Sequence, residues 1–151
     1  MKLKVSNQFN PKIIKNLYRN EKDLKLAYPT ASFPINIDEW NSWMSKGESK
    51  NFSLTWFRDE APISHIAIMS YIVDPGLVYL CFFIIDDEFR GKKLAKEILE
   101  SVYSFVRKEL RKNELWLVVD SKNNKAFNLY KREGFEIIDN RPAGIRMRKK
   151  L

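Results

Sequence analysis

The chain has 151 residues, 44% of them hydrophobic and 30% charged, a balance typical of one globular domain, here spanning residues 1–151. Its 27 Lys and Arg outnumber 19 Asp and Glu, so the net charge of +8 favours anionic partners without specifying a fold. One cysteine excludes an internal disulfide, and one cysteine with one histidine excludes a Cys/His zinc site. We therefore expect a reducing, cytoplasmic location and no membrane span, since the longest apolar run is far shorter than the roughly 20 residues required.

The N-terminal third predicts one strand and two helices. Residues 2–5 alternate polar and apolar side chains, which suits a short edge strand. Asn10 followed by Pro11 is typical of a helix cap with proline at the first helical position. Prolines break residues 28–34 into a loop, after which Asp38 is a good cap for a second helix.

The rest of the chain predicts strands interrupted by two helices. The unbroken apolar run 77–85 indicates a central strand covered on both faces. A long amphipathic helix begins near Arg90, with Leu94, Ile98 and Val102 on its apolar stripe, and a shorter helix covers residues 123–132. The other strands are expected at residues 52–56, 63–73, 115–119, 135–138 and 145–148. This order predicts an α/β fold with a mixed sheet, antiparallel early and parallel where a helix crosses over.

Basic residues gather where the central strand leads into the long helix. The first turn of a helix offers free backbone N–H groups and a partial positive charge, so it attracts anions. Placing Arg90, Lys92, Lys93 and Lys96 there is unfavourable by about 0.3–1 kcal/mol for each poorly placed charge. A bound phosphate would offset that cost, and Gly91 lets the backbone approach a ligand closely. The alternative is that these side chains are simply solvated.

The segment from Arg90 to Ala95 resembles the acetyl-CoA signature of the GNAT superfamily of N-acetyltransferases. That signature is Arg or Gln, two residues, Gly, one residue, then Gly or Ala. Arg90 and Ala95 match it, whereas Lys93 stands at the usual Gly. The backbone N–H donor survives that change.

A second block resembles the same family without a gap. Residues 123–135 match the pattern Asn-x-x-Ala-x-x-Leu-Tyr-x-x-x-Gly-Phe, and Gly134 also suits the residue that ends a helix. The two blocks occur in the family's order, and the resemblance covers about residues 50–150. It implies a GNAT-like fold: a mixed, mostly antiparallel central sheet flanked by helices.

The resemblance implies roles for particular residues. In this family the sheet splays beside the central strand, and the pantetheine arm of acetyl-CoA lies in the gap. Tyr130 occupies the family's general-acid position, where a phenol can protonate the leaving thiolate; its alternative role is aromatic packing. A backbone N–H near Ile85 stabilises the oxyanion. The implied cofactor-binding residues are Phe83, Ile84, Ile85, Arg90, Gly91, Lys92, Lys93, Leu94, Ala95, Lys96, Asn123 and Ala126.

The general base is left open. An alkylamine must lose a proton before it attacks. Family members that acetylate ribosomal-protein N-termini carry Glu five residues before the matching Asn, where this chain has Val118. Asp86 and Asp120 lie at predicted strand ends and act either through water or as ordinary caps.

Other reactive or aromatic residues are given structural roles. We expect His65 to be hydrogen-bonded structure and Cys81 an inert buried thiol. Trp40, Trp43, Tyr28 and Phe33 either line the acceptor mouth or pack in the core.

The predicted function is transfer of the acetyl group of acetyl-CoA to a primary amine of a small molecule or peptide, directly and without a metal. The first alternative keeps the fold but makes the protein a non-catalytic acyl-CoA-binding module. The second, suggested by the net charge, is a nucleic-acid-binding protein, and it ranks last. The protein is expected to be a monomer or homodimer.

Overall fold

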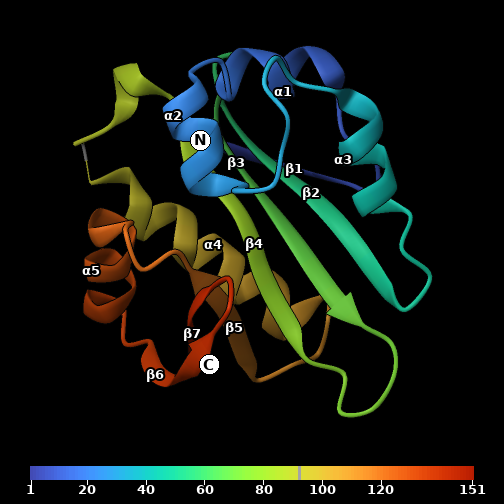
Figure 1. The fold of residues 1–151 in the computed structure, drawn as a ribbon, viewed down its shortest axis with the longest axis vertical. Coiled ribbons are helices and arrows are strands. Elements are labelled where there is room, and N and C mark those ends of the chain that lie inside the picture. The colour runs from blue at the N-terminus through green and yellow to red at the C-terminus, as the bar shows by residue number, and fades with distance from the viewer. Residues whose placement is uncertain (92) are drawn as a thin grey trace.

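The computed structural model describes residues 1–91 and 93–151 and arranges them around a seven-stranded sheet (Figure 1). The strands lie side by side in the order β1-β2-β3-β4-β5-β7-β6. Neighbours are antiparallel except β4 and β5, which are parallel, so the predicted mixed sheet is confirmed. The strands are β1 (Lys2–Ser6), β2 (Ser49–Arg58), β3 (Ala61–Tyr71), β4 (Val78–Ile85), β5 (Glu114–Val119), β6 (Glu136–Arg141) and β7 (Gly144–Lys150).

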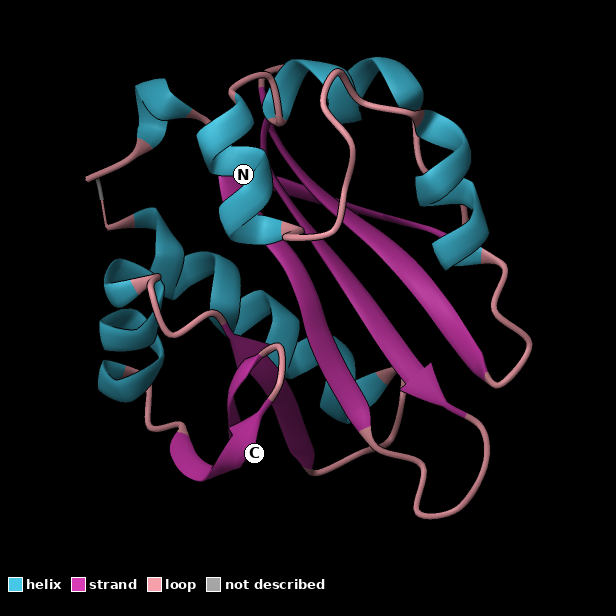
Figure 2. Cartoon of the chain, in the orientation of Figure 1, coloured by secondary structure: helices cyan, strands magenta, loops and turns pink. Residues whose placement is uncertain are grey.

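The helices cover the two faces of the sheet (Figure 2). They are α1 (Pro11–Leu17), α2 (Glu21–Ala27), α3 (Ile37–Met44), α4 (Leu94–Lys108) and α5 (Asn124–Arg132). One apolar cluster joins α4 and α5 to the sheet through side chains such as Ile98 and Val102, as the predicted stripe requires. A second cluster joins α1–α3 to β3 and β4 around Trp40 and Phe82. Within the described chain, no helix is long and apolar enough to cross a membrane.

The N-terminal region contains three short helices where the sequence predicted two. The additional helix, α2, begins after Asn20, whose side chain accepts hydrogen bonds from the N–H groups of Lys22 and Asp23. It was missed because Leu24 is its one fully buried residue, too few for a periodic pattern. The predicted cap at Asp38 was wrong: Asn36 caps α3, and Asp38 lies in its first turn.

The predicted start of the long helix near Arg90 was also wrong. Asp86 caps a short 3-10 helix, η1 (Asp87–Phe89), by accepting a hydrogen bond from the N–H of Glu88. Gly91 and Lys93 then take positive φ angles of 74° and 60°, which interrupt right-handed helical geometry. Regular helix therefore starts at Leu94.

Strand β4 bends and then leaves its parallel neighbour. Ile68 pairs with Leu80 and Ile66 with Phe83, so β4 carries an extra residue in a bulge. Within the described residues, β4 pairs with β5 at Tyr79 and Leu80, before the bulge. The end of β4 therefore has a free edge facing β5.

Candidate functional site

The free edge of β4 exposes the backbone of alternate residues. The carbonyl of Ile84 accepts a hydrogen bond from Ser64 Oγ at 2.8 Å, and the N–H of Asp86 donates to the Ile63 carbonyl at 2.8 Å. Both groups point toward β3. Because backbone direction alternates along a strand, the amides of Phe83 and Ile85 point toward the gap. Of the three residues of β4 predicted to bind the cofactor, Phe83 and Ile85 therefore direct backbone groups into the gap. Ile84 directs its backbone toward β3 and can reach the gap only with its side chain.

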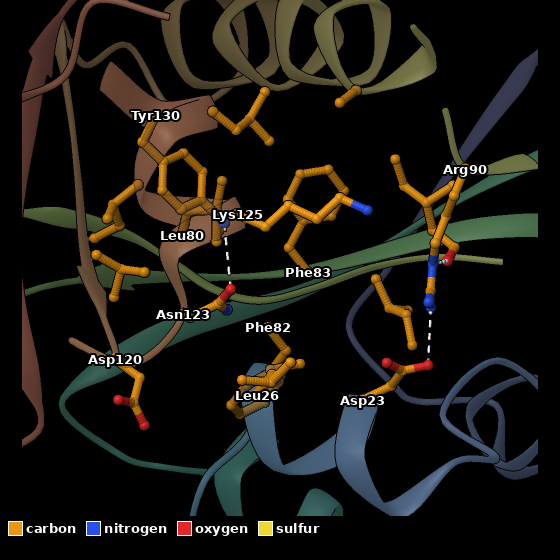
Figure 3. Close-up of a pocket in the computed structure, with 18 of the residues that line it drawn as sticks. Asp23, Leu26, Leu80, Phe82, Phe83, Arg90, Asp120, Asn123, Lys125 and Tyr130 are labelled. Carbon is orange, nitrogen blue, oxygen red and sulfur yellow. Dashed lines mark hydrogen bonds and ion pairs between the residues drawn. The ribbon is translucent and has the colours of Figure 1, made fainter. Parts of the chain in front are cut away.

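A cavity of about 550 Å³ occupies this gap (Figure 3). Its walls come from the end of β4, the loop before α4, the end of β5, α5 and α2. The predicted residues that line it are Phe83, Ile84, Ile85, Arg90, Gly91, Lys93, Leu94, Ala95, Asn123, Ala126 and Tyr130. Lys96 does not belong to this lining, and Lys92 lies outside the described residues. The fold thus brings both sequence blocks to one hollow.

The start of α4, which lines the cavity, has no side-chain hydrogen-bond cap. Lys93 is the N-cap residue, and lysine carries no side-chain acceptor to bind the first-turn amides. Gly91, Lys93 and Ala95 all line the cavity at this point. A helix N-terminus of this kind is suited to a phosphate group.

The Arg90 side chain has protein partners instead of pointing freely into the cavity. Its Nε donates to the Ile85 carbonyl at 2.7 Å, and its guanidinium pairs with Asp23 and Asp87, each at 3.1 Å. Figure 3 shows the Asp23 pair at one side of the cavity. Arg90 therefore joins α2 to the end of β4.

Helix α5 supplies the other wall. Asn123 caps it by accepting a hydrogen bond from the N–H of Ala126 at 3.2 Å. Tyr130 lies two turns later, is 5% exposed, and packs edge-on against Phe135 with ring centroids 5.5 Å apart. Burial raises the pKa of the Tyr130 phenol well above its ordinary value of 10, so it keeps its proton at neutral pH.

The two carboxylates considered as bases have different surroundings. Burial alone would raise the pKa of Asp86, but the Glu88 N–H and the Arg19 guanidinium, 3.0 and 3.1 Å away, lower it below its ordinary value. Asp86 is thus an ion-paired cap. Asp120 accepts a hydrogen bond from the Lys122 N–H at 2.9 Å and lines the cavity together with Val118.

The histidine and cysteine differ in their relation to the cavity. His65 is fully buried and bonds to Tyr18 Oη and Ser53 Oγ, each at 2.8 Å, which confirms its structural role. Cys81 is partly exposed and lines the cavity, so it is less buried than the sequence predicted. Its surroundings nevertheless raise the pKa of its thiol to about 12 by burial, which keeps it uncharged.

The aromatic residues of the N-terminal region do not line this cavity. Trp40 and Trp43 are buried in the core under α3, and Tyr28 stacks on Phe82 with centroids 4.1 Å apart. Phe33 is 41% exposed, outside the cavity lining. The cavity wall that α2 and the residues after it form is instead built from Asp23, Leu26, Ala27 and Pro29, which sequence reasoning missed along with the helix itself.

Comparisons with known proteins agree with this geometry. The model of the acetyltransferase (GNAT) family matches residues 14–135. No curated protein matches the chain. Among solved structures, an acetyltransferase from Thermus thermophilus superposes with a TM-score of 0.76 at 15% identity, covering 100% of this chain and 98% of its own.

Two further structures with the same fold contain coenzyme A. The PaiA N-acetyltransferase from Thermoplasma acidophilum has a TM-score of 0.65 at 19% identity, with 100% of both chains covered. The spermidine N-acetyltransferase from Vibrio cholerae, in complex with CoA and spermine, has a TM-score of 0.71 at 19% identity, covering 98% of this chain and 95% of that one. The family match over most of the chain, on a sheet with this splayed β4 edge, shows that the protein belongs to the GNAT family of acetyltransferases.

Proposed function

We propose that this protein transfers the acetyl group of acetyl-CoA to the primary amine of a small molecule or peptide, by direct transfer in a ternary complex. The observation that carries the proposal is the cavity between the free edge of β4 and Tyr130, bounded by the uncapped start of α4. Acetyl-CoA supplies an activated thioester for this chemistry. The residues around the cavity suit the successive parts of the acetyl-CoA molecule.

The cofactor contacts are proposed from this placement. The Phe83 and Ile85 amides at the free edge hold the pantetheine arm in the manner of an added strand. The first-turn N–H groups from Lys93 to Lys96, with Gly91 before them, hold the pyrophosphate. Asn123 contacts the cofactor from the start of α5, and Ala126 leaves room beside it. Arg90 acts indirectly, by fixing the end of β4 through the Ile85 carbonyl.

Tyr130 is the proposed general acid. It lines the cavity, and burial raises the pKa of its phenol well above 10, so the group holds a proton to donate at neutral pH. A phenol O–H can donate to the sulfur as negative charge develops there, and it can transfer the proton as the thiolate leaves; the proton that the amine loses on forming the amide balances this transfer and restores the phenol. A backbone N–H near Ile85 is the proposed donor to the oxyanion.

A non-catalytic acyl-CoA-binding protein is the second candidate. It is favoured by Val118, an apolar residue where some family members carry a carboxylate base. Tyr130→Phe separates the two functions, because an enzyme loses turnover and keeps its affinity for coenzyme A. The matched control is Tyr103→Phe, because Tyr103 is also buried but lies on α4, outside the cavity lining.

The direct test follows free thiol during incubation with acetyl-CoA and a panel of primary amines. We expect amine-dependent thiol release with equimolar acetylated amine, identified by mass spectrometry. Coenzyme A binding with no thiol release from any amine would favour the binding protein. Absence of both would reject the family's chemistry for this chain.

A further inference from the structure

The cavity has a side that the proposed cofactor contacts do not use. Leu117 and Val119 point into the core shared with α4 and α5, so strand alternation directs Val118 and Asp120 to the opposite face. Figure 3 shows Asp120 on the same side of the cavity as Leu26 of α2, across from Tyr130. This side, lined by Leu26, Ala27, Pro29, Val118, Asp120 and Ala143, is here called the α2 side.

The charges around the cavity are divided between its two sides. Lys93, Lys125 and Arg132 lie at α4 and α5, where an anionic cofactor would be held. The α2 wall contributes Asp23, whose charge is balanced by Arg90 at 3.1 Å. Asp120 is different, because no ion pair joins it to any cation of residues 1–91 or 93–151. The α2 side therefore carries a carboxylate that none of the ion pairs among the described residues includes.

Nearby arginine does not cancel that charge. Arg146 pairs across the sheet with Val118, but its guanidinium binds both carboxylate oxygens of Asp139, at 2.9 and 2.8 Å. Its remaining nitrogen donates to Tyr79 Oη at 3.3 Å. Arg146 is outside the cavity lining, so it is not available to an anionic group on the acceptor.

The α2 side also presents apolar surface. Leu26 is 36% exposed although it lines the cavity, and Ala27 and Pro29 continue the same wall. Covering such surface with an aliphatic group is favourable, because apolar area leaves water. A carboxylate alone would attract any cation, whereas a carboxylate beside an apolar wall selects a cation with an aliphatic body.

Building on the proposed acetyl transfer, we propose that Asp120 is a specificity-determining residue for the acceptor. It binds the ammonium form of a primary amine carried on an aliphatic chain, and that chain packs on Leu26. The same carboxylate repels an acceptor that has its own carboxylate on the carbon bearing the amine. The acceptor class is therefore aliphatic amines without an adjacent acid, and α-amino acids are excluded.

The test compares n-butylamine with norvaline, which is the same chain with a carboxylate added beside the nitrogen. Dissociation constants are measured by NMR titration of the protein saturated with coenzyme A, so no turnover is needed. We expect n-butylamine to bind at least about tenfold more tightly than norvaline, the ratio that one charge-assisted contact can supply. Equal binding of the two ligands would overturn the proposal.

Two variants locate the effect. Asp120→Asn keeps the oxygen that accepts the Lys122 N–H and removes the charge, so the turn is preserved. It should weaken n-butylamine binding about tenfold, with coenzyme A affinity unchanged. Asp120→Lys should reverse the preference in favour of norvaline. The matched control is Asp38→Asn, the same change at an exposed position on α3.

Failure of this inference is distinct from failure of the proposed function. If n-butylamine binds Asp120→Asn as tightly as the unaltered protein, the specificity role is refuted, whatever the rate of thiol release. If n-butylamine binds in an Asp120-dependent manner, the role is supported even where no thiol is released, and it is then the acetyl transfer that fails.

Discussion

The buried histidine predicts how the stability of this protein depends on pH. His65 is enclosed between Tyr18 Oη at 2.8 Å from Nδ1 and Ser53 Oγ at 2.8 Å from Nε2. A neutral imidazole satisfies this site, since one nitrogen donates and the other accepts. Burial lowers the pKa of His65 from 6.5 to about 3, because the charged ring would lose its hydration.

This shift links folding to protons with a definite sign. The unfolded chain protonates its histidine below about pH 6.5, whereas the folded chain does not until about pH 3. The unfolded state therefore binds more protons between these values, and the free energy of unfolding falls as the pH is lowered through this window. One proton corresponds to a slope approaching about 1.4 kcal/mol per pH unit, and to about 5 kcal/mol across the whole window.

Urea unfolding between pH 5.2 and 7 measures this slope, because in this range most carboxylates stay ionised in both states. The chain has one histidine, so the slope is assignable to a single residue. We expect the free energy of unfolding to change by only about 0.3 kcal/mol per pH unit near pH 7 and to drop by about 1 kcal/mol per unit below pH 6. His65→Gln, which hydrogen-bonds without titrating, should be nearly flat. An equal slope in both proteins, or a flat profile for the unaltered one, would refute the reasoning.

Three further predictions concern the cavity and its supports. Gly144 has a φ of 145°, and Gly144→Ala would place a Cβ 2.2 Å from the Val119 carbonyl oxygen. This variant should lower the free energy of unfolding by about 2 kcal/mol or more. A melting temperature within about 2 °C of the original would contradict this. Tyr130→Phe should slow turnover by about 10²–10⁴-fold, and the raised pKa of Tyr130 predicts no loss of rate from its ionisation up to pH 10 in steady-state profiles. Arg90→Ala removes the bonds to Ile85 and Asp23 and should cost about 1–3 kcal/mol in urea unfolding, an effect that unchanged stability would rule out.

The parts of the fold that the sequence predicted are those with strong local patterns. The apolar run that became β4 and the 3.6-residue stripe of α4 each report burial directly, since the period of the pattern is the period of the element. The segment from Asn123 to Gly134 predicted a short helix and its end, and the structure has this helix as α5, with Asn123 as its N-cap. Each of these signals is contained within a stretch of about 15 residues.

Features that depend on distant contacts could not be predicted in this way. Arg90 binds Asp23, which is 67 residues away in the chain, so its basic character alone suggested a solvent-facing or phosphate-binding side chain. The positive φ of Lys93 is unusual for a lysine, and it delayed the start of α4. Helix α2 was missed for the same kind of reason: its role as a cavity wall comes from packing across β4, not from its own periodicity.

The most direct test of the central claim is a crystal structure of the protein with coenzyme A. We expect the pantetheine arm to hydrogen-bond to the Phe83 and Ile85 amides, with the pyrophosphate on the N–H groups at the start of α4 and the sulfur facing Tyr130. Coenzyme bound elsewhere, or a gap between β4 and β5 filled by side chains when coenzyme is in excess, would contradict the account.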